Sequence, residues 1–171
     1  MRALIISAND FEDSELLFPY YRLMEEEAGV DIASIHSGRI TGKHGYSVDV
    51  NLTFDKVNPN EYDLLIIPGG KAPEAVRLNK DALRICKHFF DTNKTVASIC
   101  HGVQVLISAG LMRGRRATCW QGIKDDLIAA GAHYLDKDVV VDGVLISSRQ
   151  PGDLPAFCRE IMKRVRAEVY V

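Results

Sequence analysis

An apolar segment that ends in a cysteine and passes at once into a helical pattern is the feature that most constrains the fold of this chain. Residues 95–99 have the composition of a buried strand, Cys100 and His101 follow directly, and residues 103–107 place apolar side chains as a helix does. A sharp turn from strand to helix lifts the turn residue out of the sheet toward free backbone N–H groups. The helix dipole there favours negative charge, so we expect Cys100 to have a lowered thiol pKa and to be a nucleophile. An ordinary buried cysteine at a strand end is the alternative.

The rest of the chain alternates short apolar runs with longer amphipathic ones. Strands are expected at 2–7, 30–35, 63–67 and 95–99, a hairpin within 38–52, two short strands at 139–141 and 144–146, and helices at 13–27, 81–92, 101–109, 122–130 and 153–166. Gly29 is expected to end the first helix. Continuous apolar runs are typical of strands that are covered on both faces. The pattern therefore predicts an α/β fold, a three-layer sandwich with a mostly parallel central sheet, in one domain over residues 1–171.

The composition limits the partners, cofactors and cellular location that we expect for this chain. The chain has 171 residues, 47% of them hydrophobic, and a formal net charge of −2, which predicts no general attraction to nucleic acid or to an anionic membrane. The cysteines at 86, 100, 119 and 158 form no Cys-x-x-Cys pair, and the five histidines show no ligand spacing. We therefore expect reduced thiols, no metal and no organic cofactor. Because no signal peptide or membrane-spanning segment is recognisable, a cytoplasmic location is expected.

Three loops are expected to meet at the carboxyl edge of the sheet, where open α/β sheets bind ligands. They are residues 8–15 after the first strand, residues 68–70, and the turn at Cys100. Gly69 and Gly70 offer backbone N–H groups that can approach a ligand closely. Together with the N–H that follows Cys100 they would form an oxyanion hole, although a plain turn explains the two glycines equally well.

A cysteine nucleophile needs a proton acceptor and a group that orients it. His101 adjoins Cys100 in sequence, so its side chain leaves the turn in another direction, and a catalytic and a structural role both remain open. The candidate carboxylates are Glu12, Asp13, Glu15 and Glu74. If Glu15 is partly buried, its pKa is raised and it can donate a hydrogen bond to the thiolate; the alternative is a glutamate favoured at a helix N-terminus.

Several segments together resemble one family. They are the residues Ala97-Ser98-Ile99-Cys100-His101-Gly102, Phe11-Glu12-Asp13-Ser14-Glu15, Ile67-Pro68-Gly69-Gly70, and further stretches at 40–46, 72–74, 106–110 and 122–126. In this combination the chain resembles, over nearly its whole length, the DJ-1/PfpI superfamily. The similarity is greater to its PfpI branch, which contains intracellular cysteine peptidases that are also described as protein deglycases.

The resemblance implies a flavodoxin-like sandwich, of the class I glutamine amidotransferase-like kind, with Cys100 as the nucleophile. It implies that Glu15 contacts the sulfur, that His101 is the imidazole partner, and that Glu74 reaches His101 from a neighbouring subunit. Members of the branch form dimers that stack into hexamers or larger rings. The implied substrates are peptides or amino groups modified by glyoxal or methylglyoxal, with a cofactor-free glyoxalase (lyase) reaction and a redox-sensing stress protein or chaperone as alternatives.

The chain departs from the family pattern in two places. Val103 stands where many members have proline, a change that affects only the stiffness of the first helical turn. Trp120 stands where peptidase-like relatives carry a tyrosine whose hydroxyl could assist proton transfer. Trp120 lines the substrate pocket or packs in the core, and Cys119 beside it is a second candidate for oxidation.

Overall fold

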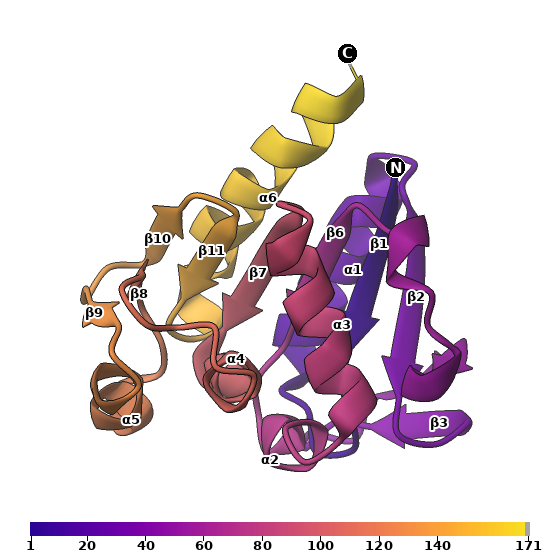
Figure 1. The fold of residues 1–171 in the computed structure, drawn as a ribbon. Helices are drawn as coiled ribbons and strands as arrows, with labels where there is room; N and C mark the ends of the chain where they lie inside the picture. Colours follow the sequence, from indigo (N-terminus) through magenta and orange to yellow (C-terminus); the bar gives the residue numbers. More distant parts are fainter. Residues whose placement is uncertain (170–171) are drawn as a thin grey trace.

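A seven-stranded sheet forms the centre of the molecule (Figure 1). The computed structural model describes the backbone of residues 1–169 and the side chains of residues 1–167. The strand order across the sheet is β10 (Val139–Asp142), β11 (Leu145–Ser148), β7 (Thr95–Ile99), β6 (Leu64–Ile67), β1 (Arg2–Ile6), β2 (Gly29–Ser34) and β5 (Leu52–Thr53). Within the described residues, β10 with β11 is the one antiparallel pair of this sheet. The predicted mostly parallel sheet is therefore confirmed.

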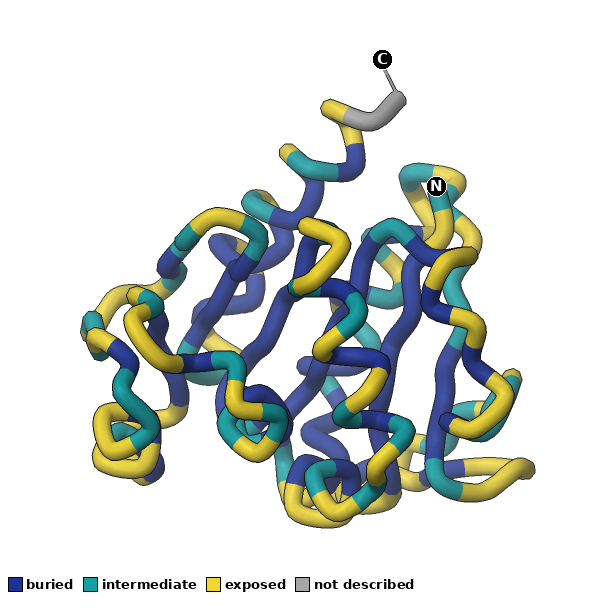
Figure 2. The backbone as a smooth tube through the Cα atoms, viewed as in Figure 1, coloured by how far each residue is buried: buried dark blue, intermediate teal, exposed yellow. Residues whose placement is uncertain are grey.

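The central strands β1, β6 and β7 are apolar on both faces because helices cover both. In the register of the sheet, Ile66 of β6 lies beside Ile5 of β1 and Ala97 of β7. These strands form the dark core of Figure 2. They run in the same direction and end at Ile6, Ile67 and Ile99, so the loops that follow them share one edge of the sheet.

Helices form the two outer layers. On one face α1 (Asp13–Glu25) packs against α6 (Leu154–Val169), and on the other α3 (Lys80–Asp91) packs against α4 (Val103–Ser108), as Figure 1 shows. The short helix α2 (Ala72–Val76) lies beyond the carboxyl ends of the strands and contacts α4, whereas α5 (Lys124–Ala129) lies beside β9 (His133–Tyr134). This is the three-layer sandwich that the sequence pattern predicts.

Two small strand pairs lie outside the main sheet. The hairpin of β3 (Gly38–Thr41) and β4 (Ser47–Val50) is antiparallel, as the glycine-rich segment predicts. The pair β8 (Arg116–Ala117) and β9 (His133–Tyr134) is parallel and was not predicted. Each strand of this second pair has two residues, too few for an alternating pattern to be recognisable.

The boundaries of several elements differ from the expected ones. The first helix ends at Glu25, and Glu27, with a left-handed φ of 57°, reverses the chain while the Ala28 N–H donates to the Leu23 carbonyl. The prediction that Gly29 ends this helix is therefore wrong, since Gly29 already belongs to β2. Helix α2 was missed because its five residues are too few to show helical periodicity.

Candidate active site

Cys100 lies on a strained turn between β7 and α4. Its φ of +60° is in the left-handed region, which a residue with a side chain rarely adopts. Residues that do adopt it cluster at functional sites. The residues Cys100–Gly102 form a 3-10 turn before α4 begins at Val103. This backbone turns the Cys100 side chain out of the sheet, and the expected elbow geometry is present.

The Cys100 side chain lines a cleft of about 480 Å³ at the carboxyl edge of the sheet. Cys100 is only 8% exposed, so the cleft gives narrow access to it. All three predicted loops contribute to the walls, which consist of Glu12, Glu15, Lys43, Gly70, Lys71, Glu74, Cys100, His101, Trp120 and Pro151. The expected convergence of the loops is therefore present in the structure.

Glu15 is fully buried in the first turn of α1 and contacts the Cys100 thiol. Its Oε2 atom accepts a hydrogen bond of 2.8 Å from the Gly69 N–H. Its Oε1 atom is buried and has no hydrogen-bond partner among the described residues. Burial raises the pKa of Glu15 to about 7 and outweighs the Gly69 hydrogen bond, which lowers it. Glu15 therefore keeps its proton at pH values where an exposed glutamate has lost it.

The pKa of the Cys100 thiol is raised, whereas the sequence predicts a lowered one. Burial is the main cause and the nearby Glu15 carboxylate adds to it, while the backbone N–H groups of His101 and Gly70 favour the thiolate. The prediction is wrong because burial and the Glu15 carboxylate, which disfavour the thiolate, outweigh the two backbone donors that favour it. The thiol and the carboxyl interact closely enough to titrate as a pair, and one form of this pair is a thiolate beside a protonated Glu15.

The raised pKa of Glu15 predicts how stability depends on pH. The folded protein holds this proton up to about pH 7 and the unfolded chain up to about 4.5, so stability falls as pH rises between these values. Glu15→Gln keeps the shape and the acceptor for Gly69 without the charge. We expect the variant to be more stable than the wild type by about 3 kcal/mol at pH 8, as measured by urea unfolding.

The same comparison at low pH is the control. Near pH 4.5 both side chains are neutral in the folded protein, so most of the difference between the two proteins should vanish. A difference in unfolding free energy that is equal at pH 4.5 and pH 8 would contradict the assignment of a raised pKa to Glu15.

The His101 ring lies alongside the Cys100 side chain although the two residues are adjacent in sequence. Its Nδ1 atom is 3.3 Å from the Cys100 Sγ, within hydrogen-bonding distance for sulfur. Trp120 stacks on the imidazole with ring centroids 6.4 Å apart and fixes its orientation. Burial lowers the pKa of His101, against the opposing charge of Glu74, so the neutral imidazole is available to accept a proton.

The two glycines after β6 have different roles. The Gly69 N–H is committed to Glu15 and so positions the carboxyl. Gly70 has a φ of +81°, and its N–H is directed at the Cys100 sulfur, as is that of His101. The expected oxyanion hole is therefore available from Gly70 and His101, whereas Gly69 supplies no free donor to it.

Three further residues from the sequence analysis have clear positions. Glu74 is exposed on α2 and lines the same cleft, where its charge reaches His101 but no hydrogen bond joins the two within the described residues. Trp120 lines the cleft and is 39% exposed, so it is a wall residue and not part of the core. Cys119 is fully buried, and burial raises its pKa to about 12. Cys119 is thus poorly placed for oxidation.

The sequence analysis missed an ion pair in the wall of the cleft. Lys43 Nζ lies 2.6 Å from Glu12 Oε2, and His44 Nε2 lies 3.5 Å from Glu12 Oε1. Asp13, another candidate carboxylate, does not face the sulfur, because its two oxygens accept the N–H groups of His44 and Tyr46. The one sequence feature that pointed to Lys43 was its position between two glycines in a segment that resembles the family. The strand pattern did not show that this segment lies at the cleft.

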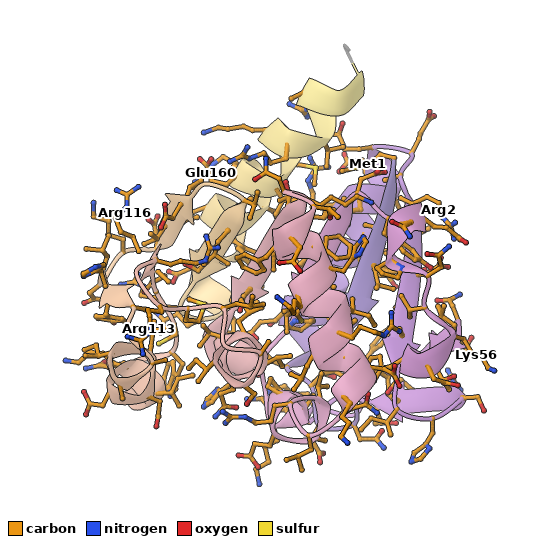
Figure 3. All side chains as sticks on the ribbon, viewed as in Figure 1. Met1, Arg2, Lys56, Arg113, Arg116 and Glu160 are labelled. Carbon is orange, nitrogen blue, oxygen red and sulfur yellow. The ribbon has the colours of Figure 1, made fainter. Side chains whose placement is uncertain are left out.

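The described residues give no support for a metal site, a basic patch at the cleft or a membrane-spanning helix. No group of three or more His, Cys, Asp or Glu residues in residues 1–167 is arranged to hold a metal ion. The basic side chains Arg113 and Arg116 lie on the flank formed by α5, β8 and β10, away from the cleft (Figure 3). No helix in the described part of the chain is long and apolar enough to cross a membrane.

Comparison with known proteins agrees with this geometry. A sequence model of the DJ-1/PfpI family matches residues 1–164. The chain belongs to the DJ-1/PfpI family. It is 57% identical to the deglycase PfpI of Pyrococcus furiosus over 166 residues, which cover 97% of this chain and all of the relative. The predicted family is therefore confirmed.

Two more distant family members support the same assignment. The putative cysteine protease YraA of Bacillus subtilis is 38% identical over 95% of this chain and 96% of its own length. A two-domain protein from Anabaena variabilis, with DJ-1/ThiJ/PfpI-like and ferritin-like domains, superposes with a TM-score of 0.94. That protein is 37% identical over 96% of this chain and 48% of its own, so the likeness concerns one part of it. DJ-1/PfpI relatives thus include proteins named as deglycases and as a cysteine protease.

Proposed function

We propose that this protein is a cysteine-dependent hydrolase that removes glyoxal or methylglyoxal adducts from amino groups. The observation that carries the proposal is the Cys100 sulfur, 3.3 Å from His101 Nδ1 and in contact with a buried Glu15, in one accessible cleft. Nucleophile, proton acceptor and acid are thus within reach of one reacting atom.

The side chains have complementary tasks in this proposal. Cys100 attacks the adduct carbon, a C–S bond forms and the C–N bond to the amine breaks. Neutral His101 takes the thiol proton and returns it to the departing amine, while protonated Glu15 donates to the sulfur. The N–H groups of Gly70 and His101 stabilise the developing oxyanion. The sulfur-bound hemithioacetal then becomes a thioester by a proton shift between its two neighbouring carbons, through an enediol. Water hydrolyses this thioester to a hydroxy acid and frees the thiol, so the reaction consumes one water and needs no added oxidant.

The choice of substrate rests on the relatives. The deglycase PfpI is 57% identical to this chain, whereas the putative cysteine protease is 38% identical, so we favour the adduct over the peptide. A side-by-side assay of a methylglyoxal-modified amine, a fluorogenic peptide and free methylglyoxal tests this choice. We expect kcat/KM to be highest for the modified amine. Faster turnover of the peptide, or of free methylglyoxal, would replace the deglycase with the protease or the glyoxalase.

Glu74 is proposed to act on the neighbouring subunit of a dimer or hexamer. Its carboxylate is exposed and makes no hydrogen bond within the described residues, so it is available to a second copy. We expect Glu74→Ala to lower kcat about tenfold while the unfolding midpoint stays unchanged, because an exposed side chain contributes little to stability.

Mixed oligomers separate action within a subunit from action between subunits. Subunits with Cys100→Ala and subunits with Glu74→Ala are unfolded together and refolded as a mixture. If Glu74 acts across the interface, sites that combine intact Cys100 with a neighbour's Glu74 regain activity. No recovery in a verified mixed oligomer, or full activity in a monomeric form, would rule out the shared site.

A further inference from the structure

The turn that carries Lys43 is pinned to the loop after β1. Asp13 accepts hydrogen bonds of 2.9 Å from the N–H groups of His44 and Tyr46, and the Lys43 N–H donates to the Phe11 carbonyl at 2.9 Å. A Cβ atom on Gly42 would lie 2.4 Å from the Asp13 carboxylate, so only glycine allows this approach. The turn therefore has a defined position at the cleft, unlike a free hairpin end.

Glu12 fixes the Lys43 side chain in turn. Its carboxylate side chain is 10% exposed, while that of Lys43 is 46% exposed. Besides Lys43, the carboxylate accepts a hydrogen bond of 3.3 Å from the Ser14 hydroxyl. A carboxylate this deeply buried is screened little by solvent, so its pairing with Lys43 is stronger than that of a surface pair.

The charged groups around Cys100 come from four elements. The loop before α1 provides Glu12, and α1 provides Glu15. The β3–β4 turn provides Lys43 and the exposed His44, and α2 provides Glu74 with Lys71 at its N-cap. His101 adjoins the sulfur. The Lys43 charge acts on Cys100, Glu15 and His101. Glu12 acts on Glu15 with the opposite sign.

We propose that Lys43 is a positioning residue that favours the anionic form of the Cys100–Glu15 pair, and that Glu12 both holds Lys43 and limits its effect. The inference rests on the proposed function only in taking Cys100 as the reactive thiol. Lys43 places a positive charge beside a thiol and carboxyl that share one negative charge, which stabilises that charge. Glu12 adds a buried negative charge near the same site, and this charge partly cancels the effect of Lys43 on the Cys100–Glu15 pair.

The two members of the ion pair should therefore shift the reactivity of Cys100 in opposite directions. Lys43→Met removes the stabilising charge. The Cys100–Glu15 pair then loses its proton at higher pH, and the Cys100 thiolate is scarcer at pH 7. Glu12→Gln keeps a side-chain oxygen that can accept a hydrogen bond from Lys43 but removes a destabilising charge, so the thiolate is more abundant at pH 7. The double variant should return close to the wild-type behaviour, since both charges are gone.

The experiment measures the rate of iodoacetamide alkylation at Cys100 from pH 5 to 10, with the modified peptide identified by mass spectrometry. We expect Lys43→Met to slow alkylation about threefold at pH 7 and to move the profile to higher pH. Glu12→Gln should accelerate it about as much and move the profile to lower pH. Alkylation does not require turnover, so these shifts can be present even if the deglycase proposal fails.

Two variants serve as controls. Lys43→Arg keeps the charge and should retain the wild-type alkylation profile. This result would show that the β3–β4 turn tolerates a change of side chain at position 43. Lys56→Met removes the same charge from an exposed position that does not line the cleft, and should leave the alkylation profile in place. The inference is overturned if the Lys43→Met profile coincides with that of the wild type, or if Lys43→Met and Glu12→Gln shift the profile in the same direction.

Discussion

Replacement of Cys100 by alanine is expected to lower turnover of methylglyoxal-modified amines by at least about 1,000-fold. No other thiol can substitute for it, because Cys86, Cys119 and Cys158 are buried and none of them lines the cleft. Loss of the sulfur removes the atom that forms the bond to the substrate, so His101 and Glu15 have nothing left to activate. The measurement is kcat/KM with the modified amine.

The variant should fold normally, so the loss can be assigned to chemistry. Alanine fits the space of the thiol, and the left-handed backbone of Cys100 is as strained for alanine as for cysteine. The matched control is Cys86→Ala, which removes a buried thiol from α3 and should leave kcat/KM unchanged. If Cys100→Ala retains substantial turnover, Cys100 is not the nucleophile and the proposed function falls.

Gly102→Ala is expected to cause the largest loss of stability among single methyl additions at the elbow. A Cβ atom at this position would lie 2.3 Å from the Ile67 carbonyl oxygen and 3.0 Å from the Ser98 hydroxyl oxygen. The Ile67 oxygen belongs to the backbone of a central strand, so no side-chain rotation relieves the overlap. Overpacking of this kind costs about 3 kcal/mol, which corresponds to a fall of about 10 °C in Tm.

Gly152→Ala provides the control for this experiment. Its added Cβ meets no atom within 4 Å, and Gly152 lies in a 3-10 turn in which alanine is accommodated. Its Tm should therefore remain within about 2 °C of the wild-type value. An unchanged Tm for Gly102→Ala would mean that β6 and the elbow can move apart, and would contradict the close approach described here.

Much of the fold could be predicted because its signals are local and repeated. Strand β7 has the predicted bounds, and the apolar run that becomes β6 correctly indicates a sheet covered on both faces. The end of α1 could not be predicted, because Glu27 adopts a left-handed conformation in a place where glycine is the usual signal. The pair of β8 and β9 depends on tertiary contacts between segments about 17 residues apart.

The site was predictable where it depends on strand ends, and much less so elsewhere. The positions of Cys100 and Glu15 follow from parallel strands that end at one edge. The thiol pKa was not predictable, since it depends on how deeply the sulfur is buried and on how close the Glu15 carboxylate lies. The Glu12–Lys43 pair was missed because the β3–β4 hairpin belongs to no layer of the sheet, so only three-dimensional contacts place it at the cleft.

The reactive groups and the walls of the cleft are anchored differently. Cys100 and the Gly69-Gly70 backbone extend directly from β7 and β6, two strands in the middle of the sheet. Lys43, Lys71 and Trp120 sit on short excursions that tie into this frame through a few loop hydrogen bonds. Substitutions in these excursions should therefore leave the backbone at Cys100 and Gly69-Gly70 in place, while they alter the shape of the cleft and the surroundings of Cys100 and His101.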